Sequence, residues 1–170
     1  LASLITLDRQ QLRRRFSLMA GADTCLDPAE PGAITALAGQ LKSFIDQEGA
    51  DLVYELSGSP EALEQSLAVA GFSGRIVIGS WYGQKVARLS LGGRFHRSRI
   101  RLISSQVSSI SPELTGRWTK SRRLDVTWSL LKKVDPIRYV THRYPFDRAQ
   151  EAYASLDQDP GRFMQVILTY

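Results

Sequence analysis

The sequence predicts an α/β protein built on a doubly wound parallel sheet. Short apolar or β-branched runs alternate with helix-like segments through residues 4–105, a pattern typical of parallel strands joined by crossover helices. The first run, residues 4–7, ends in a lone carboxylate, Asp8, and a helix-like segment follows at once. In a dinucleotide-binding βαβ unit, the acid that ends the second strand accepts hydrogen bonds from a ribose. This pattern favours a nucleotide-binding sheet.

The beginning of the chain lacks a feature that such a sheet needs. The sequence starts at Leu1, and no glycine-rich turn precedes the first strand. We therefore expect the C-terminal part of a longer protein, with a sheet that lacks its first strand. In the doubly wound order 3-2-1-4-5-6 that strand lies in the middle, so the strands on either side of it should expose unpaired inner edges.

Each element follows from apolar spacing and turn residues. The predicted strands are residues 4–7, 24–26, 51–55, 74–78, 100–103, 139–144 and 165–169. The predicted helices cover about residues 12–19, 32–45, 60–70, 112–133 and 146–156. Gly21 suits the end of the first helix, and Phe44 and Ile45 extend the apolar face of the second. We expect the strand at residues 51–55 to be of the buried type.

Two further expectations concern single side chains. Ser59 should cap the third helix, because a serine oxygen accepts hydrogen bonds from free amides and Pro60 tolerates the first turn. Trp128 lies in helical phase with Leu124 and Leu131, so we expect its indole to be buried in a core.

Composition sets the broad class of the protein. The chain has 170 residues, 43% hydrophobic and 23% charged, which fits one globular domain or one domain with part of another. Its apolar runs are shorter than the roughly 20 residues of a membrane span. The single cysteine, Cys25, excludes an internal disulfide, and it shares no metal-ligating spacing with His96 or His142. We expect a cytoplasmic protein without a membrane partner and without zinc ligands in this chain.

The net charge of the chain is compatible with more than one function. The formal net charge is +5, with arginines gathered at residues 13–15, 94–101 and 117–123. Mild basicity suits an anionic dinucleotide, and it also suits nucleic acid. A basic nucleic-acid-binding module using residues 94–101 is thus one alternative, although no helix-turn-helix or interleaved aromatic pattern supports it. A methyltransferase-like Rossmann domain that uses S-adenosylmethionine is another, because there too a strand-ending acid grips a ribose.

The candidate ligand-binding residues lie at the carboxyl ends of the predicted strands. In open α/β sheets, ligands bind outside those ends. Three turns with small residues follow strands there, at residues 56–58, 78–80 and 102–104. Asp8 favours NAD over NADP, since a carboxylate repels a ribose 2′-phosphate. Arg9 could tolerate that phosphate, so NADP stays an alternative.

The order of these segments resembles the C-terminal part of a zinc-type medium-chain dehydrogenase/reductase, the zinc alcohol dehydrogenase type. The matching stretches are ITLD with its basic helix, MAGADTCLDP, GADLVYELSGSPEALEQSLAVAGFSGRIVIGS and VDPIRYVTHRYPFDRAQEAYASLDQDPGRFMQVILTY. The resemblance implies a partial NAD(P)-binding Rossmann domain over residues 1–105. Residues 106–170 would be the C-terminal helix and strand segment of a GroES-like catalytic domain.

The family resemblance also implies roles for nine residues. It places Asp8 and Arg13 at the adenosine ribose, Leu56, Ser57 and Gly58 over the adenosine half, and Ile78, Gly79, Leu102 and Ser104 beside the nicotinamide. A position that often holds a cation near the pyrophosphate is Gln165 here, with Arg162 close but not aligned. This departure weakens the expected phosphate binding on that side.

The implied parent enzyme would transfer a hydride between an alcohol or polyol and NAD(P). Its zinc ligands would lie upstream of this chain, and the parent would be a homo-oligomer acting on a small molecule. The chain alone should therefore be inactive, free of zinc, poorly stable and weak in binding NAD. The segment SSISPELTGRWTKSRRL is unlike the best-known alcohol dehydrogenases and suggests a bacterial subgroup with a larger or polar substrate.

Overall fold

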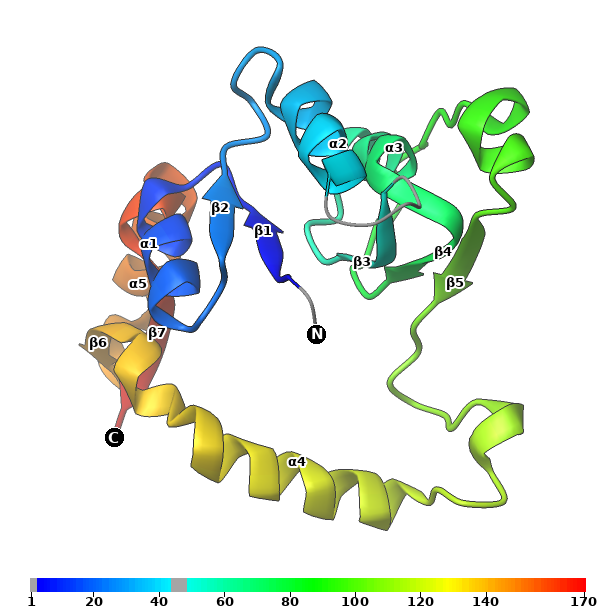
Figure 1. The fold of residues 1–170 in the computed structure, drawn as a ribbon. Coiled ribbons are helices and arrows are strands. Elements are labelled where there is room, and N and C mark those ends of the chain that lie inside the picture. Colours follow the sequence, from blue (N-terminus) through cyan, green and yellow to red (C-terminus); the bar gives the residue numbers. More distant parts are fainter. Residues whose placement is uncertain (1–2, 44–48) are drawn as a thin grey trace. The chain divides into compact units, whose positions relative to one another are not determined.

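The chain forms two compact units in the computed structural model, which describes residues 3–43 and 49–170 (Figure 1). Unit 1 combines Leu1–Pro31 with Gly116–Tyr170, and unit 2 is Gly32–Thr115. The predicted apolar positions Phe44 and Ile45 lie outside the described residues. The two units are defined by their compactness, and they do not correspond to the predicted division at residue 105. That division separates the two domains that the family resemblance implies, and it stays a prediction.

Unit 1 contains two small parallel sheets, β1–β2 and β6–β7. Its elements are β1 (Ile5–Leu7), α1 (Gln11–Met19), β2 (Thr24–Leu26), α4 (Lys120–Val134), η3 (Pro136–Tyr139), β6 (Val140–Pro145), η4 (Phe146–Arg148), α5 (Ala149–Gln158), η5 (Pro160–Arg162) and β7 (Gln165–Thr169). Helix α1 lies beside both strands of the β1–β2 sheet (Figure 1). It ends where Gly21, at φ 103°, donates its N–H to the Leu18 carbonyl at 3.0 Å, as predicted for this glycine.

Unit 2 contains a parallel sheet in the order β3–β4–β5. Its elements are α2 (Ala33–Ser43), β3 (Ala50–Glu55), α3 (Pro60–Val69), β4 (Ala70–Ile78), η1 (Leu91–Phe95), β5 (Arg101–Ser104) and η2 (Pro112–Leu114). Helix α3 begins as predicted, because Pro60 occupies its first turn and the Ser59 hydroxyl accepts the Ala62 N–H at 3.4 Å.

The main core of unit 2 lies between α3 and the sheet. Leu63 and Leu67 of α3 pack with Ala70 and Ile76 of β4 and with Ile100, which precedes β5. Among the side chains that the structure describes, Ile76 is the largest one fully removed from solvent. Burying one such aliphatic side chain contributes roughly 1.5–3 kcal/mol. Strand β4 lies between β3 and β5, so the segments that follow the three strands begin at a sheet packed against α3.

The predicted α/β class with parallel strands is confirmed. Strands β1 and β2 form one sheet, and β3, β4 and β5 form another. The buried-type prediction for residues 51–55 was wrong, however. Strand β3 pairs with β4 alone among the described strands, and Tyr54 is 61% exposed. Val53 packs against the core, whereas Leu52 and Tyr54, which alternate with it along the strand, stay exposed.

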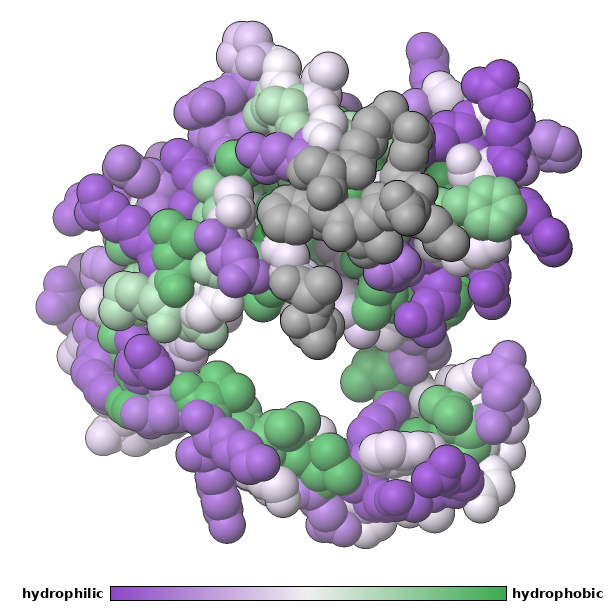
Figure 2. All heavy atoms as spheres, viewed as in Figure 1, coloured by the Kyte–Doolittle hydropathy of each residue, from purple (hydrophilic) through white to green (hydrophobic). Residues whose placement is uncertain are grey.

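The predicted helix at residues 112–133 is interrupted. A single 3-10 turn, η2, precedes a separate helix, α4, whose first turn is capped by Thr119 accepting the Arg122 N–H at 3.1 Å. The expected burial of Trp128 was also wrong, because its side chain is 58% exposed. The spacing of Leu124, Trp128 and Leu131 places the three side chains on one side of α4. Spacing alone does not show whether another element packs against that side. Figure 2 shows apolar side chains at the surface of α4.

Candidate cofactor-binding site

Asp8 follows β1 directly and sits at the carboxyl end of the β1–β2 sheet. Its backbone N–H donates to the Leu26 carbonyl at 3.1 Å, which extends the strand pairing by one step. Its Oδ1 accepts the Gln10 N–H at 2.7 Å, a local turn that leads the chain into α1. Within the described part of the chain, Oδ2 has no donor. The half-buried carboxylate thus keeps an acceptor for another group.

A cavity of about 310 Å³ opens beside Asp8 within unit 1. Side chains of β1, α1 and β2 form much of its wall. The lining residues are Thr6, Leu7, Asp8, Arg13, Phe16, Ser17, Ala20, Cys25, Tyr139 and Met164. Asp8 and Arg13, which the resemblance pairs at a ribose, therefore border the same space. An acceptor and a cation beside apolar walls suit a sugar attached to a flat ring.

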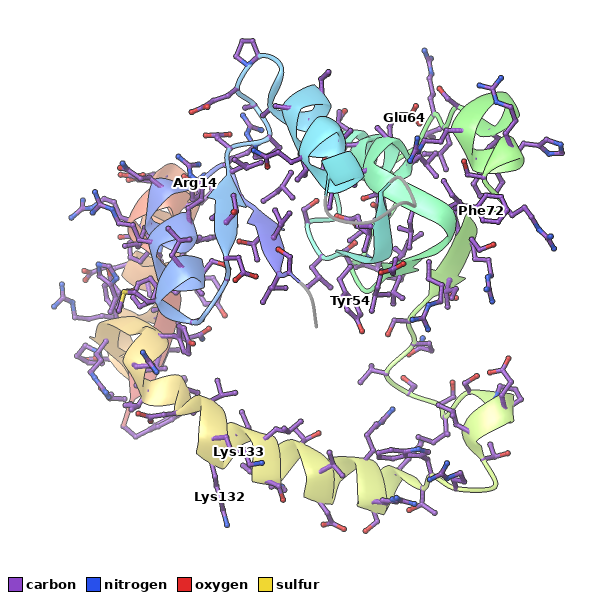
Figure 3. All side chains as sticks on the ribbon, in the orientation of Figure 1. Arg14, Tyr54, Glu64, Phe72, Lys132 and Lys133 are labelled. Carbon is purple, nitrogen blue, oxygen red and sulfur yellow. The ribbon has the colours of Figure 1, made fainter. Side chains whose placement is uncertain are left out.

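Arg14 is a residue that the sequence analysis missed. Its Nη1 donates to the Asp8 carbonyl at 2.7 Å and to the Asp27 Oδ2 at 2.8 Å, and it also reaches the Arg9 carbonyl at 3.0 Å. The side chain, labelled in Figure 3, thereby ties the start of α1 to the end of β2. The signal was present in the arginine run and in the acid that follows β2. Spacing alone could not say which arginine faces inward.

The carboxyl end of β3 holds a second acid, Glu55, which the sequence analysis also passed over. Its side chain is 3% exposed. Oε1 accepts the Ser57 N–H at 2.7 Å, the Ser57 hydroxyl at 2.6 Å and the Gly58 N–H at 3.2 Å. Oε2 accepts the Tyr82 hydroxyl at 2.6 Å and the Ser80 hydroxyl. The carboxylate is thus fully used inside unit 2.

These bonds set the ionisation of the Glu55 and Tyr82 side chains. Burial raises the pKa of Glu55, but the donors from Ser57, Ser80 and Tyr82 outweigh it, so the pKa lies below its ordinary value. Burial, with the hydrogen bond to Glu55 and its negative charge, raises the pKa of Tyr82 to about 12. Both side chains therefore keep their ordinary charge states at neutral pH.

The structure gathers several other predicted residues at this end of the β3–β4–β5 sheet. Gly79 follows β4 and donates its N–H to the Glu55 carbonyl at 3.0 Å. A Cβ at Gly79 would lie 2.8 Å from Leu56 Cδ2, so the glycine allows that side chain to approach. Leu56 itself is 69% exposed. A flat ligand could meet its apolar surface.

The remaining predicted residues differ in how they face solvent. Ile78 and Leu102 pack against the core of unit 2, while Ser104 is exposed and lies opposite Ile78 in the register of β4 and β5. Gly58 is buried at φ 69°, and a Cβ there would lie 2.9 Å from the Trp81 carbonyl oxygen. Seven of the nine predicted residues thus belong to unit 2, and Asp8 and Arg13 belong to unit 1.

Two further features are the residues expected near the cofactor phosphates and the possible metal ligands. Gln165, at the start of β7, donates its Nε2 to the Val166 carbonyl at 3.1 Å, and Arg162 is exposed in η5. No group of three or more potential metal ligands occurs among the described residues. Among the same residues, no helix has the length and apolar character needed to cross a bilayer.

Comparison with known proteins identifies the family. The family model for zinc-binding dehydrogenases matches residues 2–121. The chain belongs to the zinc-binding dehydrogenase family. Its parallel strands with crossover helices correspond to the Rossmann-like, C-terminal region of these dehydrogenases.

Individual members of the family show how much of such a protein this chain represents. D-guloside 3-dehydrogenase of Escherichia coli (strain K12) is 26% identical over 159 residues, covering 88% of this chain and 43% of that protein. L-threonine 3-dehydrogenase of Pyrococcus furiosus is also 26% identical over 159 residues, covering 88% of this chain and 40% of that protein. The chain thus spans about two fifths of the length of the curated relatives it matches.

A solved structure shares the fold. A short chain alcohol dehydrogenase (rspB) from Escherichia coli CFT073, complexed with NADH, matches with a TM-score of 0.75 at 18% identity. The match covers 99% of this chain and 44% of that chain. At this identity the likeness shows the fold alone.

Proposed function

We propose that this chain is the cofactor-binding part of an NAD(P)-linked dehydrogenase that oxidises an alcohol or polyol. Membership of the zinc-binding dehydrogenase family, together with the Asp8 cavity, carries the proposal. When bound, NAD(P) accepts the hydride that leaves the substrate carbon. The family relatives with D-guloside and L-threonine in their names support a substrate with a secondary alcohol.

The proposed roles belong to residues at the carboxyl ends of strands in each unit. Asp8, with its open Oδ2, accepts hydrogen bonds from the adenosine ribose, and Arg13 borders the same cavity. The remaining proposed contacts are Leu56, Ser57 and Gly58 for the adenosine half and Ile78, Gly79, Leu102 and Ser104 for the nicotinamide. Because a carboxylate disfavours a 2′-phosphate, we propose NAD as the preferred cofactor.

In this proposal zinc belongs to the intact parent enzyme, and its ligands are not residues of this chain. The described side chains do not fit a metal ion, since no three potential ligands gather. No step is therefore assigned to zinc here. The domain division at residue 105, a cytoplasmic location and a homo-oligomeric parent belong to the same proposal.

A heteronuclear NMR titration of the 19.0 kDa chain tests the proposal. NAD, NADP and a short DNA duplex are added separately. We expect NAD to shift amides near Asp8 and Arg13 with weak affinity, about millimolar, because the chain is a partial domain. The control variant Glu30→Gln changes an exposed acid of unit 1 and should bind NAD as the wild type does. Stronger binding of NADP, or shifts with DNA alone, would contradict the proposal.

A further inference from the structure

The carboxylate of Glu55 collects hydrogen bonds from two separate segments of unit 2. The turn after β3 supplies the Ser57 N–H, the Ser57 hydroxyl and the Gly58 N–H, all within 3.2 Å of Oε1. The segment after β4 supplies the hydroxyls of Ser80 and Tyr82 to Oε2. One side chain therefore joins the turn at residues 56–58, which the proposed function places at the adenosine half of the cofactor, to the segment at residues 80–82.

The turn after β3 has the geometry of an anion-binding site. The N–H groups of Ser57 and Gly58 point to one oxygen, and Gly58 adopts φ 69°. Successive amides of this kind form a concavity that binds anions such as phosphate. Here the anion is part of the chain, because the Glu55 carboxylate fills the concavity. The Ser57 and Gly58 amides are therefore already occupied and do not point at the phosphates of a dinucleotide.

The two turns also touch one another directly. The Tyr82 hydroxyl, whose single proton goes to Glu55, also lies 3.3 Å from the Ser59 carbonyl oxygen, and Lys85 Nζ donates to the Gly58 carbonyl at 3.0 Å. Trp81, between the two residues that bond Glu55, is 89% exposed. Ser80 and Tyr82 are thus bonded to Glu55, while the Trp81 side chain between them stays accessible to a ligand.

We propose that Glu55 is a positioning residue that locks the turns at residues 56–58 and 80–82 into one surface for the neutral adenosine part of the cofactor. The proposal rests on the proposed function and deepens it. Glu55 does not touch the ligand. It fills the amide concavity from inside, so the turn meets the ligand with the exposed apolar side chain of Leu56.

The first experiment tests whether a carboxylate occupies the concavity. In Glu55→Ala, the amide resonances of Ser57 and Gly58 should shift when sodium acetate is added, with sodium chloride at equal ionic strength as the reference. In the wild type the same amides should not respond, because the site is already filled. Glu64→Ala is the matched control, since Glu64 is a carboxylate of α3 that accepts a loop amide, Ser90 N–H, at 3.0 Å (Figure 3).

The second experiment tests positioning. NAD and adenosine are titrated into the wild type, Glu55→Ala and Glu55→Gln. We expect Glu55→Ala to bind both at least about tenfold more weakly, a loss equivalent to one charged hydrogen-bond partner, and acetate to restore part of the affinity. Glu55→Gln should bind nearly as the wild type does, because its Oε1 can still accept both amides. Its NH2 group can donate to the Ser80 and Tyr82 hydroxyls, which can turn to accept.

Each outcome decides the inference. Acetate shifts in Glu55→Ala, with weakened NAD binding there, support it. Equal NAD affinity in the wild type and Glu55→Ala, or no acetate response, overturns it. Absence of NAD binding in every variant refutes the positioning role together with the proposed function, and the acetate response then separately reports whether the concavity exists.

A further measurement applies if Glu55→Ala fails to fold. Glu55→Gln must then show faster hydrogen exchange at the Ser57 and Gly58 amides, because a neutral acceptor binds them less strongly. Unchanged exchange overturns the inference.

Discussion

Two acids at strand ends, Asp8 after β1 and Glu55 at the end of β3, use their carboxylates in opposite ways. Asp8 follows β1, accepts one internal amide and borders a cavity. Glu55 ends β3, is almost fully buried and accepts from two amides and three hydroxyls. An acid at a strand end is therefore not by itself a sign of ligand binding. What distinguishes the two is whether the chain satisfies the carboxylate itself.

The largest expected effect is on folding and comes from Glu55. Replacing Glu55 with Ala leaves the buried donors of both turns without a partner, and we expect it to lower the free energy of unfolding by about 3 kcal/mol. Urea unfolding followed by circular dichroism measures this. Asp8→Ala is the comparison variant and should lower it by less than about 1 kcal/mol. Similar losses in the two variants would break the contrast between the acids.

A second expected effect separates two neighbouring arginines of α1. Arg14 holds the Asp8 and Arg9 carbonyls and the Asp27 carboxylate, whereas Arg13 borders the cavity. Arg14→Ala should lower the free energy of unfolding by about 2 kcal/mol. Arg13→Ala should change it by less than about 0.5 kcal/mol. The same unfolding assay measures both, and a larger loss in Arg13→Ala would reverse the assignment.

A third expected effect is on cofactor choice and comes from Asp8. Removing the carboxylate removes both an acceptor for the ribose and the repulsion of a 2′-phosphate. We expect Asp8→Ala to reduce the preference for NAD over NADP about tenfold, as for the loss of one charged hydrogen bond. Parallel titrations with the two cofactors measure the ratio. A wild-type preference for NADP would contradict the role given to Asp8, and Arg9 would then be the residue to test.

The smallest expected effect is a change of stability at the extremes of pH. Because the pKa of Glu55 is lowered from 4.5, its contribution is present above that pH and is lost as the pH falls through the folded value. Because the pKa of Tyr82 is raised from 10.0 to about 12, its contribution is present below pH 10.0 and is lost as the pH rises toward about 12. Tyr82→Phe should remove the alkaline loss in pH-dependent unfolding. An unchanged alkaline slope would contradict the Tyr82–Glu55 hydrogen bond.

Sequence reasoning predicted the elements whose causes are local. The Ser59–Pro60 start of α3 follows from capping chemistry, and β7 was predicted with the bounds that the structure gives. The alternation of strands and helices predicted parallel strands, and the structure has them in each of its sheets. Asp8 and Arg13 were predicted together and border one cavity.

The failures concern burial and long-range contacts, which no local pattern encodes. Trp128 has the phase of a core residue, yet its exposure depends on what lies against α4. Glu55 was visible as the end of a strand, but its role depends on Ser80 and Tyr82, which are 25 and 27 positions away. Period and propensity describe one segment at a time, so they could not find a carboxylate shared by two segments.

The Asp8 carboxylate accepts one hydrogen bond from the described residues, and this has a consequence for how cofactor preference can change. A residue that contributes little to folding can be exchanged without a compensating substitution elsewhere. Variation at residues 8 and 9 could therefore move a protein of this kind between the two nicotinamide cofactors in few steps. Glu55 offers less freedom, because a shorter side chain there would leave the donors of both turns without an acceptor. Selection can explore one strand end while it must preserve the other.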